Sequence, residues 1–309
     1  MKKIPVIMDC DPGHDDALAL VLAFSSSKLD VKAVTVTGGN QTLIKTLSNA
    51  KKVLHCLGKY PPLGCGADRP LIRELETAGE VHGASGLDGP DLKIPDDYKT
   101  EPAAALMRRI ILESPQAITL IPTGPLTNIA ILFSAYPEVK QNIKQISLMG
   151  GGIYLGGNRT STAEFNMYVD PEAAEIVFNS GIPIIMAPLD VTHKALVLAE
   201  DVAELRKSGG KVSVMAADLI DFFYKYHLEQ GFAGAPLHDP CAVAALIAPE
   251  IFKTKDFHVK IETSGKHTAG MTVADLRFWT DAKPNVTALL DIDRKAFVNL
   301  LIDACKSYD

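Results

Sequence analysis

The sequence predicts an α/β protein built around one open, mostly parallel sheet. Strand-like and helix-like segments alternate along the chain, an order typical of parallel sheets. The strand-like runs are almost continuously apolar, which indicates that helices cover both faces of the sheet. We therefore expect a doubly wound fold. A single domain spanning residues 1–309 is expected, because α/β domains reach this length as one unit.

In the first part of the chain, strands and helices follow one another regularly. Strands are expected at 4–8, 31–37, 117–121, 145–149 and 182–187, and helices at 16–24, 41–57, 102–113, 125–134 and 171–179. Leu43, Leu47, Ala50 and Leu54 share one face of the 41–57 helix. Residues 64–100 are rich in Gly, Pro and Asp. They are expected to form a long irregular region of the kind that often carries function.

The C-terminal part adds helices and a small second element. Helices are expected near 199–229, 240–247 and 294–305, and the strand-like runs in 256–290 predict a small antiparallel element. In open parallel sheets, ligands bind at the carboxyl ends of the strands. The polar residues that follow each strand are therefore the candidates for a site.

Composition restricts the classes of partner and the compartment. The 31 Lys and Arg residues are outnumbered by 37 Asp and Glu, with no basic stripe, which argues against nucleic-acid binding. No apolar run reaches the ~18 residues of a membrane span, and the first strand is too short for a signal peptide. The cysteines are Cys10, Cys56, Cys65, Cys241 and Cys305. Their odd number and scattered positions predict reduced, mostly buried thiols in a cytoplasmic protein.

An acidic cluster follows the first strand. Residues 9–16, DCDPGHDD, carry four carboxylates and no Lys or Arg. Asp15 or Asp16 could simply cap the next helix, but capping does not explain Asp9 and Asp11 at the end of an apolar strand. A hard divalent cation with oxygen ligands, Ca²⁺ or Mg²⁺, would relieve the repulsion. The loop length and closing Glu of an EF-hand are absent.

The 9–16 segment resembles the N-terminal signature of the inosine–uridine-preferring nucleoside hydrolases, and the resemblance covers nearly the whole chain. Further matching stretches are 39–42 (GNQT), 81–83 (VHG), 122–128 (PTGPLTN), 148–152 (LMGGG), 163–166 (AEFN), 170–174 (DPEAA) and 238–240 (HDP). The family's fold, an open parallel sheet with ligands at strand ends, agrees with the one expected above.

The resemblance implies a site for each motif. A Ca²⁺ ion would be held by Asp11, Asp16, Asp239 and the backbone carbonyl of Thr123. Asp9 would support the loop and Asp15 would hydrogen-bond the ribose. Ribose contacts are also implied for Asn40, Met149, Asn158, Glu164 and Asn166. Simpler interpretations exist for some positions: Asn40 as a turn residue, and Asp239 as the N-cap before Pro240. For Asp170, before Pro171, we accept the N-cap interpretation.

The implied reaction is cleavage of an N-glycosidic bond through an oxocarbenium-like sugar. Asp11 would act as general base for the attacking water. His82 and His238 are candidate catalytic acids or hydrogen-bond donors to the departing base, although each could be an ordinary loop histidine. His227, Tyr224 and Tyr226 could face the base from a helix. Helical spacing makes Phe222 and Phe223 core residues.

The substrate preference implied by the resemblance is for cytidine and uridine. His82, His238 and the Asp-Phe-Phe run are similar to bacterial pyrimidine-preferring members, whereas purine-specific members surround the base with tryptophans. The single Trp279 lies in a segment without a motif. An inosine-preferring or broad-specificity hydrolase is the alternative. The family also implies nucleoside salvage and a homotetramer or dimer.

Two other function classes stay open at this point. A phosphohydrolase of the haloacid dehalogenase type also opens with Asp-x-Asp, but it needs Thr or Val where this chain has Gly13. A Ca²⁺-dependent nucleoside-binding protein would use the same residues without catalysis. Release of free ribose separates hydrolysis from binding.

Overall fold

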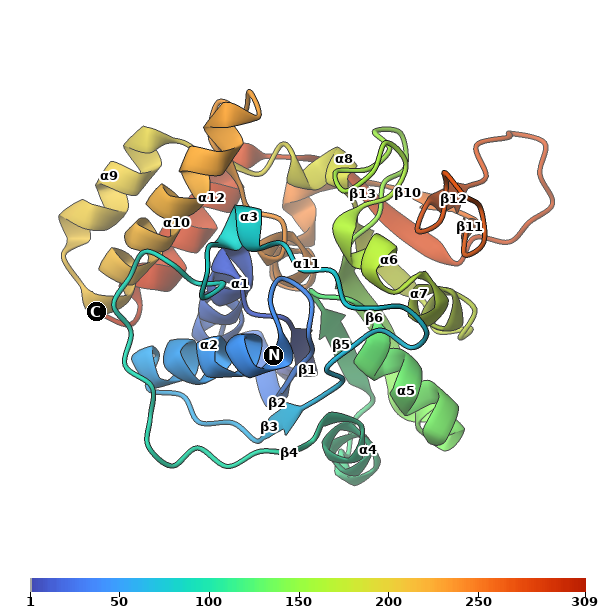
Figure 1. Cartoon of the computed structure of the whole chain (residues 1–309), viewed down its shortest axis with the longest axis horizontal. Coiled ribbons are helices and arrows are strands. Elements are labelled where there is room, and N and C mark those ends of the chain that lie inside the picture. The colour runs from blue at the N-terminus through green and yellow to red at the C-terminus, as the bar shows by residue number, and fades with distance from the viewer. Residues whose placement is uncertain (1) are drawn as a thin grey trace.

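A nine-stranded sheet runs through the protein in the computed structural model, which describes residues 2–309 (Figure 1). Its order is β10-β13-β7-β6-β5-β1-β2-β3-β4. The strands are β1 (Ile4–Cys10), β2 (Leu29–Val36), β3 (Leu63–Cys65), β4 (Glu101–Pro102), β5 (Ile118–Pro122), β6 (Ile143–Met149), β7 (Ile184–Ala187), β10 (Phe252–Phe257) and β13 (Val286–Ile292). Only the β10–β13 pair of this sheet is antiparallel. The predicted open, mostly parallel α/β fold is confirmed.

The strand order places a switch point at the middle of the sheet. β1 pairs with β2 on one side and with β5 on the other. After β1 the chain builds outward through β2, β3 and β4, and then returns to build the other half from β5. Connections therefore diverge at the carboxyl ends of β1 and β5, where open sheets hold their ligands. Asp9 lies opposite Pro122 in register, and the Thr123 N–H donates to the Asp9 carbonyl at 2.8 Å.

Helices cover both faces of the sheet, as the apolar strands predict. In β1, Val6 and Met8 pack into one core and Ile7 into the other. The first core is covered by α1 (His14–Ser25), α2 (Leu43–Cys56), α9 (Ala199–Ser208), α10 (Lys211–Glu229), α11 (Pro240–Ile247) and α12 (Arg294–Lys306). The second is covered by α4 (Ala103–Glu113), α5 (Thr127–Ala135) and α7 (Pro171–Phe178). Figure 1 shows the two groups on opposite sides of the strands.

Helix α1 is the element that fixes the acidic cluster in place. Its residues from His14 to Ala23 are all buried, because the helix is apolar on nearly every side and contacts α11 and α12 as well as the sheet. Its first turn carries Asp15 and Asp16. The positive end of the helix dipole favours carboxylates there. A buried helix with little freedom to shift thus presents two acids at the switch point.

The expected C-terminal antiparallel element is only part of what the structure contains. β11 (Val259–Ile261) and β12 (Thr272–Ala274) form a separate antiparallel pair. β13, by contrast, joins the main sheet parallel to β7, because Val286 and Ala288 pack into the second core. The remaining elements are α3 (Gly79–His82), α6 (Phe165–Val169), α8 (Leu189–Thr192), β8 (Leu196–Val197), β9 (Ala235–Pro236) and the 3₁₀ turns Pro137–Asn142 and Pro249–Ile251.

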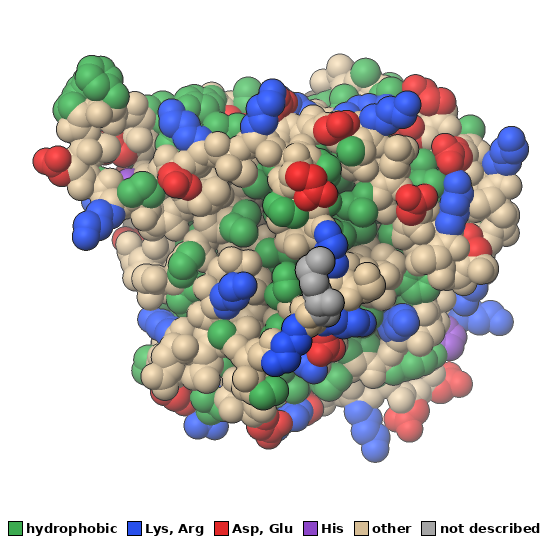
Figure 2. Space-filling view, turned by 180° about the vertical axis from the view of Figure 1, so that it is seen from behind, with side chains coloured by type: hydrophobic (Ala, Val, Ile, Leu, Met, Phe, Trp, Pro, Cys, Tyr) green, Lys and Arg blue, Asp and Glu red, His purple; other side chains and the backbone are tan. Residues whose placement is uncertain are grey.

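The surface, the cysteines and the helices can each be compared with what the sequence led us to expect. Basic and acidic side chains are interspersed over the face in Figure 2. The loop between β12 and β13 projects from the body (Figure 1) and exposes Phe278 by 94% and Trp279 by 65%. All five cysteines are unpaired, and all but Cys65 are buried. Within residues 2–309, none of the helices has the length and apolar character that crossing a membrane requires.

Candidate active site

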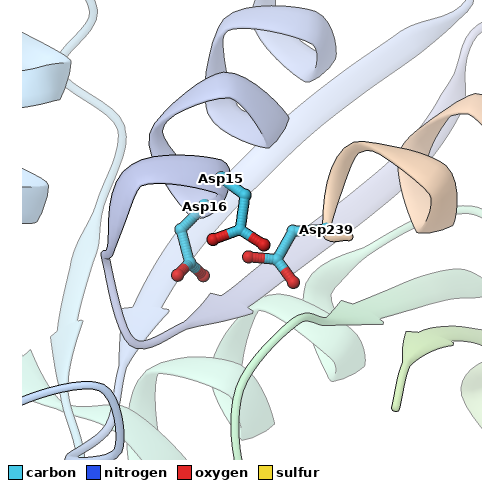
Figure 3. Close-up of side chains that lie close together, drawn as sticks. All are labelled: Asp15, Asp16 and Asp239. Atoms are coloured by element: carbon cyan, nitrogen blue, oxygen red, sulfur yellow. The ribbon is translucent and has the colours of Figure 1, made fainter. Parts of the chain in front are cut away.

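Three carboxylates from two helices meet at the switch point. Asp15 and Asp16 come from the first turn of α1, and Asp239 immediately precedes α11 (Figure 3). Each offers an oxygen within 4.8 Å of the others, and all three side chains are buried. Asp239 forms no side-chain hydrogen bond that caps α11. The simpler N-cap interpretation therefore does not account for its position.

Asp11 lies beside this group with one oxygen unused. Its Oδ2 accepts a hydrogen bond from the Asn40 backbone N–H at 2.6 Å. Its Oδ1 is buried and has no partner among residues 2–309. A Cβ at Gly124 would stand 2.3 Å from that Oδ1, so only glycine fits beside this oxygen. Burial is the main cause that raises the pKa of Asp11 well above its ordinary value, and the nearby negative charge of Asp16 raises it further.

Asp16 accepts hydrogen bonds from two separate segments of the site. Its Oδ2 accepts from the Gly13 N–H at 2.9 Å, which is the capping contact considered from the sequence. Its Oδ1 accepts from the Thr123 hydroxyl at 2.8 Å. Asp15 lines the cavity, and burial together with the charge of Asp16 raises its pKa to about 7. Asp16 therefore ties the start of α1 to the end of β5.

Asp9 supports the loop from beneath. Its Oδ1 accepts from the Thr35 hydroxyl at 2.5 Å and from the Asn128 amide at 2.9 Å. Its Oδ2 is buried without a partner among residues 2–309. Burial raises the pKa of Asp9 to about 7. The residue links β1 to β2 and α5, the supporting position expected for it.

The donor set of this cluster fits a hard divalent cation. All candidate ligands are oxygens, which Ca²⁺ and Mg²⁺ prefer. Asp15, Asp16 and Asp239 converge, and the buried Asp11 Oδ1 lacks a partner within residues 2–309. The raised pKa values of Asp11, Asp15 and Asp239 show that without a cation these groups favour protonation. A divalent cation would remove that penalty.

Two of these carboxylates, Asp15 and Asp239, line a cavity of about 350 Å³. The structure brings almost every site residue expected from the sequence to its wall. These are Asp15, Asn40, His82, Thr123, Met149, Asn158, Glu164, Asn166, His227, His238 and Asp239. Asp11 and Asp16 lie behind this surface, fully buried. The volume suits a small ligand.

A polar wall is organised by Glu164 and Asn166. The Glu164 carboxylate caps α6 and accepts from the N–H groups of Asn166 and Gly151, both at 2.9 Å. Burial raises the pKa of Glu164 to about 6. The Asn166 amide donates to the Thr123 carbonyl at 2.8 Å, so this expected metal ligand already has one partner. A carbonyl oxygen has a second lone pair for a ligand.

Asn40 and Asn158 also hold backbone in place. The Asn40 amide donates to the Asp11 carbonyl and to Asp16 Oδ2, both at 3.2 Å, so its side chain holds the distant acidic loop. The Asn158 Oδ1 accepts from the Phe165 N–H at 2.9 Å. Both side chains still reach the cavity. Their structural bonds place their amide groups in fixed orientations toward a ligand.

A further part of the cavity lining, the histidine wall, consists of histidines and aromatic rings. His227 Nδ1 lies 2.9 Å from the Phe223 carbonyl, and His238 Nδ1 lies 2.8 Å from the Thr192 hydroxyl. Burial is the main cause that lowers the pKa of His82 and His238 well below the ordinary histidine value, and that of His227 to about 4. Burial therefore favours the neutral form of these histidines.

The α10 aromatic run divides between core and cavity. Tyr226 and His227 reach the cavity, whereas the Tyr224 hydroxyl donates to the Ala233 carbonyl. Phe223 is 2% exposed and belongs to the first core, as expected, but it also lines the cavity. Phe222 is only half-buried and stacks on His14. Trp279 is not a lining residue.

Sequence reasoning missed several residues around the cavity. Arg159, His193, Gln230 and Phe232 line it, and they come from loops without a motif. The sequence also showed no sign of a role for His14, although it lies inside the acidic motif. In the structure His14 contacts His82. The expectation for Asp170 is confirmed, since its carboxylate accepts from the Ala173 N–H at the start of α7.

Comparisons with known proteins agree with this geometry. The family model for inosine-uridine preferring nucleoside hydrolases matches residues 6–299. The pyrimidine-specific ribonucleoside hydrolase RihA of Citrobacter koseri is 52% identical, and the alignment covers 99% of each chain. RihA of Escherichia coli O157:H7 is 51% identical over the same share.

Solved structures of nucleoside hydrolases have the same fold as this chain. A purine-preferring ribonucleoside hydrolase from Gardnerella vaginalis superposes with a TM-score of 0.92 at 28% identity, covering 98% of each chain. A plant nucleoside hydrolase superposes with a TM-score of 0.90 at 30% identity, covering 99% of each. The haloacid dehalogenase alternative finds no support in these relatives. With its switch-point carboxylates and its full-length family match, the chain belongs to the inosine-uridine preferring nucleoside hydrolases, enzymes that cleave N-glycosidic bonds.

Proposed function

We propose that this enzyme is a Ca²⁺-dependent hydrolase that cleaves ribonucleosides, preferentially cytidine and uridine, to free base and ribose for nucleoside salvage. The observation that carries the proposal is one cavity with three distinct linings. Asp15 and Asp239 contribute oxygen ligands, Glu164 and Asn166 contribute hydrogen-bonding groups, and histidines and aromatic rings contribute the rest. A nucleoside has three parts that match these linings: the reacting C1′ centre, the ribose hydroxyls and the base.

The proposed cation ligands are Asp11, Asp16, Asp239 and the Thr123 carbonyl. Asp15 converges with Asp16 and Asp239 in the structure, and we assign it to the ribose as the resemblance implies. Ca²⁺ bound in this cluster would bind the ribose diol and lower the pKa of a water molecule. The oxygen-only donor set supports this assignment, as does the Asp11 Oδ1, which has no partner within residues 2–309.

Asp11 is the proposed general base. Its Oδ2 is held by the Asn40 N–H, while Oδ1 has no partner among residues 2–309, so one oxygen is fixed and the other can take a proton from water. Asn40, Asn158, Glu164 and Asn166, with Met149 packing beside them, would orient the sugar. Hydrogen bonds from fixed groups to the ribose hydroxyls align C1′ with the attacking water.

The departing base is assigned to the histidine wall. His82 and His238 are the proposed catalytic residues here, with His227 contacting the base. The rings of Phe223, Tyr226 and Phe232 supply apolar and aromatic surface beside them. A planar base stacks favourably on such surface. The pyrimidine preference is supported by the names of the RihA relatives and by Trp279 lying outside the cavity lining.

A substrate panel tests the proposal. Free ribose and kcat/KM should be measured for cytidine, uridine, inosine, adenosine and the 2′-deoxy forms, with Ca²⁺ present. We expect the pyrimidine ribosides to give the highest kcat/KM. A clear preference for inosine or adenosine would refute the pyrimidine assignment. Tight nucleoside binding without ribose release would instead identify a binding protein. The homo-oligomer, a dimer or tetramer, and the cytoplasmic location stay predictions.

A further inference from the structure

Arg159, which has no role in the proposed reaction, joins two segments that line the cavity from distant parts of the chain. Its Nη1 donates to Glu80 Oε1 at 3.1 Å, and its Nη2 donates to Glu76 Oε2 at 2.7 Å. Glu80 belongs to α3, which also carries His82, and both line the cavity. Arg159 lines it too, next to Asn158. One guanidinium therefore connects the segment that carries His82 to the loop that carries Asn158.

The main chain at Arg159 is anchored beside the polar wall. The Arg159 N–H donates to the Ala163 carbonyl at 3.1 Å, and Ala163 directly precedes Glu164. Tyr168 of α6 supports the bridge from the same side. Its hydroxyl donates to Glu76 Oε1 at 2.9 Å, and the Arg159 guanidinium lies 5.8 Å from the centre of its ring. The side chain of Arg159 therefore extends from a fixed backbone.

The segment on the other side of the bridge has few anchors of its own. Across residues 74–82, the main chain makes one hydrogen bond to another part of the described chain, from the Ala78 N–H to the Asn40 carbonyl at 3.1 Å. Helix α3 has only four residues, and so short a helix is not stable by itself. Its position at the cavity therefore depends on side-chain contacts, and those with Arg159 are the ionic ones.

A contribution to global stability does not explain these ion pairs. The side chains of Arg159, Glu76 and Glu80 are partly exposed, and exposed ion pairs add little to the free energy of unfolding. A planar guanidinium can bind two carboxylates at once in fixed directions, whereas the ammonium group of Lys is a point charge. The arrangement is suited to setting the distance between two segments.

We infer that Arg159 is a positioning residue that holds α3, and with it His82, at a fixed distance from Asn158 and Glu164. The roles of His82 at the base and of Asn158 and Glu164 at the sugar rest on the proposed function. A nucleoside that contacts both parts of the lining then meets a site with the correct spacing. Without the bridge, the substrate has to order residues 74–82 as it binds, and that ordering weakens binding.

Hydrogen exchange of the substrate-free protein with Ca²⁺ present tests the positioning directly. In Arg159→Gln, amide exchange in peptides covering residues 74–83 should be about 3- to 10-fold faster than in wild type, whereas exchange in α5 should not change. Glu80→Gln should give a smaller increase in the same peptides, because one of the two ion pairs remains. Arg108→Gln is the matched control, since it breaks a surface ion pair to Glu138, 2.9 Å long, outside the cavity lining.

Kinetics separate positioning from general damage to the site. In Arg159→Gln, KM for uridine should rise about 3- to 10-fold. The inhibition constant of ribose, which lacks a base, should not change, whereas general damage would raise both constants. Arg159→Gln and Glu80→Gln combined should raise KM no more than Arg159→Gln alone, because both cut the same bridge. Arg159→Lys keeps the charge and should lie between wild type and Arg159→Gln.

Unchanged exchange in residues 74–83 of Arg159→Gln would overturn the inference. Equal increases in KM and in the ribose inhibition constant, or effects of Arg159→Gln and Glu80→Gln that multiply, would overturn it as well. If Arg159→Gln does not fold, Glu80→Gln decides the question through the same peptides. Because hydrogen exchange needs no substrate, faster exchange in a protein whose wild type hydrolyses no nucleoside would support the positioning and overturn only the proposed function.

Discussion

The Asn40 backbone N–H donates to Asp11 Oδ2 at 2.6 Å and leaves Asp11 Oδ1 as a buried oxygen without a partner in residues 2–309. One hydrogen bond thus fixes the carboxylate while its second oxygen stays available. An Asn at position 11 could retain the bond to Asn40 through its amide oxygen. It would place an NH₂ group where the free oxygen lies. The side chain would keep its shape but would lose its negative charge and its proton-accepting oxygen.

Asp11→Asn should therefore fold normally but lose most of its turnover. Loss of a general base costs about 10²–10⁴-fold in rate, and weaker metal binding would add to that. The decrease should fall mainly on kcat, because the base acts in the transition state. The measurement is kcat and KM for uridine at saturating Ca²⁺. A kcat within a few-fold of wild type at full metal occupancy would show that another group activates the water.

Asp15→Asn should behave differently from Asp11→Asn. Asp15 lines the cavity, whereas Asp11 does not, and we assign Asp15 to the ribose 2′-hydroxyl. Its replacement should narrow the difference in kcat/KM between uridine and 2′-deoxyuridine. The ratio of the two substrates is the readout, with bound metal measured in the same preparation. An unchanged ratio would remove Asp15 from recognition of the 2′-hydroxyl.

Metal removal should abolish hydrolysis. Prolonged chelation should release the cation held by the acidic cluster, and added Ca²⁺ should restore the rate because the ligands are oxygens only. The measurement is ribose release together with elemental analysis of the protein before and after chelation. Full activity in rigorously metal-free protein would contradict the proposed cofactor.

The carboxylates should also make stability depend on pH and Ca²⁺ together. Burial raises the pKa of Asp9 and Asp15 from 3.8 to about 7. The folded protein then keeps protons that the unfolded chain has released, so this contribution to stability is lost as pH rises toward 7. The buried histidines have the opposite effect on stability below their ordinary pKa of 6.5. The pKa of His14 and His227 is lowered to about 4, so their contribution to stability falls as the pH falls below 6.5. Above pH 6.5 the histidines no longer change the stability, and the carboxylates set its dependence on pH.

The test is Tm with and without Ca²⁺ between pH 6.5 and about 8. In metal-free protein, Tm should fall over this range, and the increase in Tm caused by Ca²⁺ should be larger at the higher pH. Protons compete with the cation at the lower pH, which gives the trend its sign. An increase in Tm that is equal at both ends of the range would show that the cluster does not bind the added ion.

His82→Ala and His238→Ala should each reduce kcat/KM for uridine while leaving bound Ca²⁺ unchanged, because both rings line the cavity without being proposed metal ligands. On the proposed assignment, both variants should mainly lower kcat, because donation to the departing base acts in the transition state. Unchanged uridine hydrolysis in both variants would refute the assignment of the base to the histidine wall.

Asp170→Ala should lower stability without altering kcat. The buried Asp170 carboxylate accepts from the N–H groups of Ala173 and Leu71 and from the Thr127 hydroxyl. Its loss should cost about 1–3 kcal/mol in the free energy of unfolding. Asp293 is the matched control, since it is exposed and caps α12 through Ala296 alone. Asp293→Ala should cost about 1 kcal/mol. Equal losses in urea unfolding would contradict the added role of Leu71 and Thr127.

The sequence by itself determined the type and order of most elements. The near-continuous apolar runs of β1, β5 and β6 predict buried parallel strands, and α11 has the expected bounds. Asp170 before Pro171 predicted an N-cap that the structure contains. These features depend on the local chain, because periodicity, capping and burial of a single segment can be evaluated without knowing its neighbours.

Only the tertiary structure decided which distant groups meet. It brings Asp239 to Asp15 and Asp16, places β13 parallel to β7, and sets His14 against His82. The family resemblance implied the first of these contacts, but composition and spacing indicated none of them. Each depends on how helices and strands from separate parts of the chain pack against one sheet. A local pattern of residues contains no information on the distance between two elements, and packing supplies it.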